Sequence, residues 1–176
     1  MLGVTMVGGD TRRPSKTRVR PAAGSTVCEN VSLMPSASNV GAIDAATVCL
    51  INAARRAAGL TPLVENTALG RAAVGHSADM VAANYFDHVG SDGRGIEQRV
   101  MAAGFKGSTT RLAENLAAAT GSDATPAATV ASWLASPAHR ANILDPAYRQ
   151  AGVGVIGGLP AIVGTTPGAT YTADFA

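Results

Sequence analysis

The order of two hydrophobic patterns along the chain restricts its fold most strongly. From residue 44 to residue 144 the apolar residues recur mainly at helical spacing, whereas residues 152–158 and 169–175 alternate as strands do. Segments rich in glycine and proline lie between and around these two runs and indicate turns. Helices first and strands last predict an α+β fold, in which helices pack on a small antiparallel sheet.

Capping residues predict where the first two helices begin and end. Asp44 is a candidate amino-terminal cap for a helix that ends at Gly59, and Asn66 or Thr67 can cap a second helix. The second helix has one apolar stripe that includes a histidine. The residues of this stripe are Leu69, Ala72, Ala73, His76, Met80 and Ala83. We therefore expect His76 to pack in the core.

The middle of the chain is more irregular. Residues 86–95 contain Asp-Gly and further glycines and predict a loop, and residues 96–104 predict a short helix. The segment 112–118 fits either a strand or a turn.

Two proline steps then predict two consecutive helices. Thr125-Pro126 combines a capping threonine with a proline in the first turn, and Ser136-Pro137 repeats this arrangement. Proline disfavours helical geometry in the residue before it, so Ser136 is expected to cap a short helix that carries His139 near its start. Asp145-Pro146 is expected to end that helix.

Charge separates the amino-terminal region from the rest. Residues 1–27 carry a net charge of +4, and residues 28–176 carry −2. Of all residues, 15% are charged and 47% are hydrophobic, so most of the chain is expected to be globular. We divide it into a basic, flexible leader at 1–43 and one domain at 44–176. Such a leader is usually a solvated tether, although it can contact an anionic surface weakly.

The two cysteines lie on either side of this boundary, and the residues alone leave their state open. A bond between Cys28 and Cys49 would close a loop of about 22 residues, worth about 3 kcal/mol, and would indicate an oxidising compartment. Without a bond, Cys49 would be a small buried hydrophobe of the first helix.

The residues alone also leave open whether the protein is exported. No run of about 20 apolar residues is present, so no membrane-spanning helix is expected. The opening stretch MLGVTMVGG is too short and too rich in glycine for the apolar core of a signal peptide.

Four residues can carry chemistry: His76, His88, Glu114 and His139. Histidine and carboxylate groups in one cleft can hold a divalent metal ion or transfer protons near neutral pH. Their spacing matches no local metal motif, and HExxH, Walker A and GxSxG sequences are absent. We expect a neutral ring at His139, because the dipole at a helix start disfavours the imidazolium.

Six segments of the chain occur in an order that is typical of one protein family. They are LINAARRAAGLTPL, GHSADMVAANYFDHVGSDG, LAENLAA, WLASPAHRANIL, GVGV and YTADF. Together they resemble the bacterial branch of the CAP superfamily, which comprises cysteine-rich secretory proteins, antigen 5 and pathogenesis-related-1 proteins. Its domain is also called the SCP domain, and the resemblance covers residues 44–176.

The resemblance implies a three-layer α-β-α sandwich and a cleft that two histidines and two glutamates line in many members. His88 of YFDH, Glu114 of AEN and His139 of SPAHR match three of these four residues. Ser136 stands where other members carry the glutamate of a W-x-x-E segment. We expect this departure to weaken metal binding, because one anionic ligand is lost.

Further expectations follow from the same resemblance. Asn115 joins the cleft, and His76, Arg140 and Asn142 support it. Because family members are secreted, the resemblance favours a disulfide between the two cysteines. It also favours a location outside the cell or in the cell envelope.

The family has no single reaction, and three hypotheses follow. The first is a non-enzymatic, monomeric binding module whose His88, Glu114 and His139 cleft takes a divalent ion such as zinc or a small apolar ligand of lipid or sterol type. The second is a hydrolase in which Glu114 or His139 activates water. The third is a structural protein of the cell envelope. None of them requires a specific nucleic-acid partner.

Overall fold

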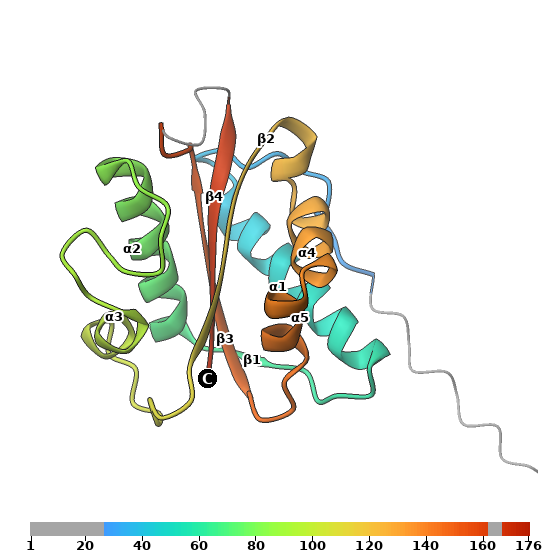
Figure 1. Cartoon of the computed structure of the whole chain (residues 1–176). Helices are drawn as coiled ribbons and strands as arrows, with labels where there is room; N and C mark the ends of the chain where they lie inside the picture. Colours follow the sequence, from blue (N-terminus) through green and yellow to red (C-terminus); the bar gives the residue numbers. More distant parts are fainter. Residues whose placement is uncertain (1–26, 162–166) are drawn as a thin grey trace, which may run out of the picture.

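A four-stranded sheet lies between two layers of helices in the computed structural model, which describes residues 27–161 and 167–176 (Figure 1). One side carries α2 (Thr67–Ala83) and α3 (Ile96–Ala102), and the other carries α1 (Val40–Ala57), α4 (Pro126–Ala135) and α5 (Pro137–Leu144). The α+β prediction and the three-layer sandwich are thus confirmed. Most of the predicted leader, and with it any surface contact of its basic residues, lies outside the described residues.

The sheet has the strand order β1-β3-β4-β2. Its antiparallel strands are β2 (Ala113–Thr120), β3 (Gln150–Gly157) and β4 (Gly168–Phe175). The short strand β1 (Val64–Glu65) pairs with β3 in parallel, so the sheet is mixed rather than purely antiparallel. Residues 112–118, which the sequence left open, supply most of β2, and a 3-10 turn (Gly121–Ala124) follows it.

The cap of the second helix was predicted correctly, and that of the first was not. The side-chain oxygen of Asn66 accepts hydrogen bonds from the N–H groups of Ala68 and Leu69. In contrast, α1 begins at Val40, and Asp44 lies inside the helix. The Asp44 side chain is half-buried there, and burial raises the pKa of its carboxyl to about 7. Asp44 therefore lies within α1 and packs against neighbouring elements, and it does not cap the amino-terminal end of the helix.

The two proline steps form consecutive helices as expected, but the role predicted for the Ser136 side chain is wrong. The hydroxyl of Thr125 accepts the N–H of Ala128 and caps α4. Ser136 lies between α4 and α5 with an extended backbone, yet its hydroxyl makes no capping hydrogen bond. Extended geometry before Pro137 is therefore sufficient to separate the two helices.

Hydrophobic clusters lie on both sides of the sheet. The larger cluster faces α1, α4 and α5, and in it the rings of Trp133 and Tyr171 meet edge to face with centroids 6.4 Å apart. The indole N–H of Trp133 also donates to the carbonyl of Leu116 on β2. The smaller cluster lies by α2 and α3 and includes Leu69 and Val100. Ala83, at the end of α2, is exposed and so does not belong to the buried stripe predicted for this helix.

A buried arginine joins the end of α1 to the segment after α5. The guanidinium of Arg55 donates to the backbone carbonyls of Thr61, Ile143, Asp145 and Tyr148. Arg55 is fully buried, so these four carbonyls replace the water that a charged group requires.

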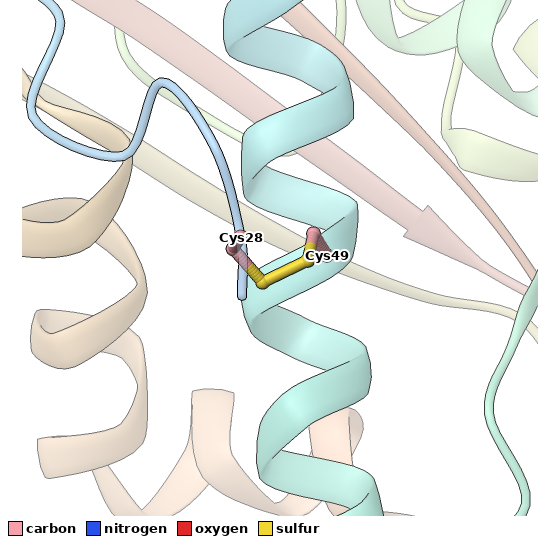
Figure 2. Close-up of a disulfide and its surroundings, with 2 residues drawn as sticks. All are labelled: Cys28 and Cys49. Carbon is pink, nitrogen blue, oxygen red and sulfur yellow. A yellow bond between two sulfur atoms is a disulfide. The ribbon is translucent and has the colours of Figure 1, made fainter. Parts of the chain in front are cut away.

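The disulfide favoured by the family resemblance is present. Cys28 is bonded to Cys49 on α1, as Figure 2 shows. Farther along the same segment, the carbonyl of Val31 accepts the N–H of Ala127 at the start of α4. The described residues before α1 are therefore fastened to two helices of the domain.

Helix α2 lies unusually close to β3. A side chain at Gly152 would overlap the backbone at Gly70, and one at Gly154 would overlap the backbone at Val74. Ser77 adds hydrogen bonds to the Gly154 carbonyl and to the Thr172 hydroxyl. This close approach fixes the helix that carries His76.

We predict that Gly154→Ala destabilises the protein by about 3 kcal/mol or more, because the added methyl group meets rigid helix backbone. Gly75→Ala is the matched control on α2, where an added methyl group meets open space and should stabilise the helix by about 0.5–1 kcal/mol. Urea unfolding followed by circular dichroism measures both effects. A Gly154→Ala protein as stable as the wild type would contradict the close contact.

Candidate functional site

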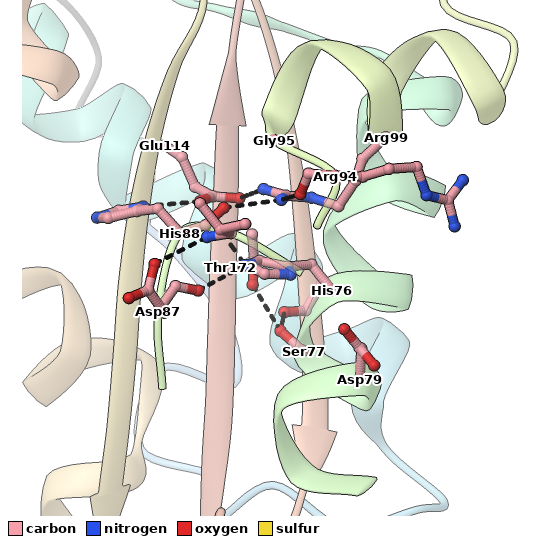
Figure 3. Close-up of polar contacts among 12 residues, drawn as sticks. His76, Ser77, Asp79, Asp87, His88, Arg94, Gly95, Arg99, Glu114 and Thr172 are labelled. Carbon is pink, nitrogen blue, oxygen red and sulfur yellow. Dashed lines mark hydrogen bonds and ion pairs between the residues drawn. The ribbon is translucent and has the colours of Figure 1, made fainter. Parts of the chain in front are cut away.

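A buried carboxylate lies at the centre of the candidate site. Glu114 is on β2, and its side chain is 4% exposed. Its Oε1 lies 2.7 Å from Nδ1 of His88, and its Oε2 accepts a 2.5 Å bond from Nη2 of Arg99 (Figure 3). The carboxylate is therefore held between the 86–95 loop and α3.

Arg99 fixes the loop that carries His88. Besides Glu114, its guanidinium donates to the backbone carbonyls of His88 and Arg94, at 2.8 and 2.9 Å. Arg99 was not predicted from the sequence. Its one local signal is a charged side chain beside Val100 on the buried face of a short helix.

His88 is oriented and accessible at the same time. Its side chain is 60% exposed, and its contact with Glu114 favours the tautomer in which Nδ1 carries the proton. In the described parts of the chain, no group bonds to Nε2. This nitrogen is thus free to accept a proton from solvent or from a ligand.

His76 lies in the core, as predicted, and supports the start of the loop. Its Nε2 is 3.0 Å from the carbonyl of Asp87, and its Nδ1 is 3.4 Å from the hydroxyl of Tyr85. Burial is the largest of several effects on its pKa and lowers it, which favours the neutral ring. Nε2 of His76 also lies 3.8 Å from Oε1 of Glu114, so the ring packs beside the carboxylate.

A second buried carboxyl group lies beside Glu114 and was not predicted. Asp174 on β4 is the direct register partner of Glu114 and is fully buried. Neither of its oxygens has a hydrogen-bond partner among the described residues. Burial, followed by the charge of Glu114, raises the pKa of Asp174 well above its usual range, so the protonated form is favoured.

His139 belongs to a neighbouring part of the site. It is half-buried on α5, and its backbone carbonyl accepts a hydrogen bond from Asn115, which in turn accepts one from Asn142. Burial, and then the charge of His88, lowers the pKa of His139. This direction favours the neutral ring that was expected, although burial rather than the helix dipole is the main cause. Arg140 is exposed on the same helix.

The carboxylate that the family resemblance assigns to a metal ion has protein partners in this structure. No three acidic, histidine or cysteine side chains among the described residues lie together as a metal-binding group. Glu114 contacts His88 and Arg99, and the guanidinium opposes a second cation beside the same carboxylate. A zinc site formed by His88, Glu114 and His139 stays a prediction of the family resemblance.

An apolar groove lies between β2 and α4, and His139 is part of its lining. Its cavity volume is about 470 Å³. The apolar lining residues are Phe86, Leu116, Ala117, Ala118, Ala119, Ala128 and Trp133. The polar ones are Asp123, Thr129, Ser132 and His139. The short side chains of the alanine run leave this space open beside the strand.

Comparison with known proteins identifies the family. The family described as "CAP: Cysteine-rich secretory protein family" matches residues 48–158. The chain belongs to the CAP family. The uncharacterized protein YkwD of Bacillus subtilis is 37% identical over 119 residues, which are 68% of this chain and 44% of YkwD.

Solved structures share the CAP fold. An extracellular SCP-domain protein of Bacillus anthracis has a TM-score of 0.60 and 27% identity over 78% of this chain and 40% of its own. An outer surface protein of Borrelia burgdorferi has a TM-score of 0.59 and 16% identity over 73% of this chain and 87% of its own. This chain thus spans less than half of YkwD and of the Bacillus anthracis protein. Where the CAP chain is described, no helix has the length and apolarity that a membrane crossing requires.

We predict that Arg99→Met destabilises the CAP domain by about 3–5 kcal/mol, because it leaves the buried Glu114 carboxylate without its partner. Asp92 and Arg94 form an exposed ion pair, so Arg94→Met is a matched control that should change the free energy of unfolding far less than Arg99→Met. Urea unfolding of single and double variants measures these effects. If the free-energy changes of Arg99→Met and Glu114→Gln simply add in the double variant, the two side chains do not stabilise each other.

Proposed function

We propose that this CAP domain is a secreted, non-enzymatic binding module whose groove between β2 and α4 takes a small apolar ligand of lipid or sterol type. The observation that carries this proposal is the lining of the groove, which combines mostly apolar side chains with a few polar ones. Its volume of about 470 Å³ falls within the range of about 300–1,000 Å³ that is usual for small-molecule sites.

The edge of the groove supports the same proposal. Phe86 is 38% exposed at the rim, where an apolar ligand would cover it. His139 and Ser132 offer polar contacts to a hydroxyl or carboxyl head group of the ligand.

A location outside the cell is part of the proposal. The disulfide between Cys28 and Cys49 persists in oxidising compartments. The structural relatives described above also include an extracellular protein and an outer surface protein. Both observations favour export of this chain.

A neutral fluorescent probe tests the groove. We expect N-phenyl-1-naphthylamine to bind saturably to the wild type and at least about tenfold more weakly to Ala128→Phe, because the added ring on α4 fills the cavity. Ala82→Phe places the same ring at an exposed position on α2 and should leave binding unchanged. A sterol or a fatty alcohol should displace the probe. Equal binding by wild type and Ala128→Phe would exclude the groove as the site.

One observation favours hydrolysis as a second candidate function. Glu114 orients His88 through the 2.7 Å contact, and the exposed ring can take a proton from water at Nε2. The carboxylate therefore acts with His88, whereas the sequence had suggested Glu114 or His139 as the base. In this candidate Glu114 positions the base and does not itself take the proton from water.

A hydrolase would lose activity when this orientation is lost. We expect Glu114→Gln to lower kcat/KM for 4-nitrophenyl acetate about a hundredfold if His88 is a general base. Glu97→Gln removes an exposed carboxylate from α3 and is the control. Wild-type turnover no faster than that of buffer, or an equal effect of both substitutions, would rule out this second candidate.

A further inference from the structure

The apolar groove opens on the edge of the sheet and not only on one of its faces. Four consecutive residues of β2, 116–119, line it. Side chains alternate between the two faces along a strand, so a cavity that reaches all four residues lies beside the strand edge. β2 is the last strand in the order, and its partner β4 lies on its other side (Figure 1). Strand backbone therefore forms one wall of the groove.

The backbone groups of alternate residues of β2 point away from β4. In an antiparallel pair, the N–H and C=O groups of one residue face the partner strand, and those of the next residue face away. The indole of Trp133 on α4 donates to the carbonyl of Leu116 at 2.9 Å. Asn142 on α5 lies 3.4 Å from the carbonyl of Glu114. Both carbonyls thus face outward, and Ala118 continues this alternation, so its N–H and C=O groups face the groove.

Ala118 offers a donor and an acceptor that the domain itself does not use. The residue is half-buried and belongs to the lining of the groove. Outside the ladder between β2 and β4, no hydrogen bond joins its backbone to another described residue. A ligand made of hydrocarbon alone would cover both groups without replacing their bonds to water, which is unfavourable. The groove therefore favours a ligand that carries its own acceptor and donor.

The two groups together match one amino-acid residue. A residue that lies opposite Ala118 in antiparallel geometry donates its N–H to the Ala118 carbonyl and accepts the Ala118 N–H at its own carbonyl. A lipid ester offers the acceptor but lacks the donor. Trp133 already occupies the carbonyl of Leu116, so this pairing does not continue toward Glu114 as a longer strand. The strand edge is thus suited to a single residue with an apolar extension.

We propose that the groove binds an N-acylated amino-acid residue, such as the start of a lipopeptide. The acyl chain lies along the apolar lining, and the residue that carries it pairs with the backbone of Ala118. This inference rests on the proposed function, because it needs a groove that takes a lipid chain. It adds the chemical class of the head group, which is aminoacyl.

Two ligands that differ by one methyl group test this pairing. N-decanoylglycine methylamide carries the N–H donor, and N-decanoylsarcosine methylamide has a methyl group in place of that hydrogen. Displacement of N-phenyl-1-naphthylamine measures the Kd of each compound. We expect the glycine compound to bind the wild type about tenfold more tightly, because the sarcosine compound leaves the Ala118 carbonyl without a donor. The glycine compound should also move the amide proton signal of Ala118 downfield in NMR spectra of the ¹⁵N-labelled protein.

Ala118→Pro tests the other hydrogen bond. Proline removes the N–H of this residue, and edge strands tolerate proline where the missing N–H faces away from the ladder. The variant should bind the glycine compound about tenfold more weakly than the wild type does. It should bind the fluorescent probe like the wild type, which also shows that it is folded. Ala118→Gly keeps both backbone groups and is the matched control, with an unchanged Kd for the glycine compound.

The outcomes separate this inference from the proposed function. If the wild type binds the probe but binds both compounds equally, or neither of them, the aminoacyl head group is wrong and the apolar groove stands. Undiminished binding of the glycine compound by a folded Ala118→Pro protein has the same meaning. If the wild type does not bind the probe, the proposed function fails and this inference fails with it. Should Ala118→Pro not fold, the two Kd values of the wild type and its Ala118 amide signal decide.

Discussion

The close packing of α2 on β3 is the constraint on which the rest of the structure depends. Only glycine at positions 152 and 154 lets the helix backbone come so near the strand. At that separation Ser77 reaches β3 and β4, and His76 reaches the 86–95 loop. The loop then places His88 over Glu114. The two glycines of β3, whose side groups are single hydrogen atoms, thus help to determine where the polar site beside α2 lies.

Electrostatics accounts for the form of that site. Two carboxyl groups, Glu114 and Asp174, are buried side by side on neighbouring strands, and one guanidinium faces Glu114. Both carboxyl groups cannot be charged in such surroundings without a large cost, so the protonated form of Asp174 is favoured while Glu114 pairs with Arg99 and His88. This balance leaves His88 oriented but accessible. The polar site therefore lies beside α2 and α3, whereas the groove beside α4 has a mostly apolar lining.

Much of the fold could be predicted from sequence because its signals are local. Helical spacing, strand alternation and the caps at Asn66 and Thr125 each depend on a few neighbouring residues. Asp44 failed as a cap because burial against the sheet, which is not a local property, determines its place. The family resemblance placed His88 and Glu114 in one cleft. The partners Arg99 and Asp174 were missed, because the contacts that define them join segments 15 to 60 residues from Glu114.

The hydrogen bonds from α4 and α5 to β2 have a consequence for the sheet as a whole. β2 is the last strand in the order, so no strand among the described residues pairs with its outer backbone groups. Trp133 donates to the carbonyl of Leu116, and Asn142 lies within hydrogen-bonding distance of the carbonyl of Glu114. Exposed strand edges invite pairing with other chains, and side chains that occupy such acceptors oppose it. The same tryptophan that fills the core therefore also protects the domain against edge-to-edge aggregation.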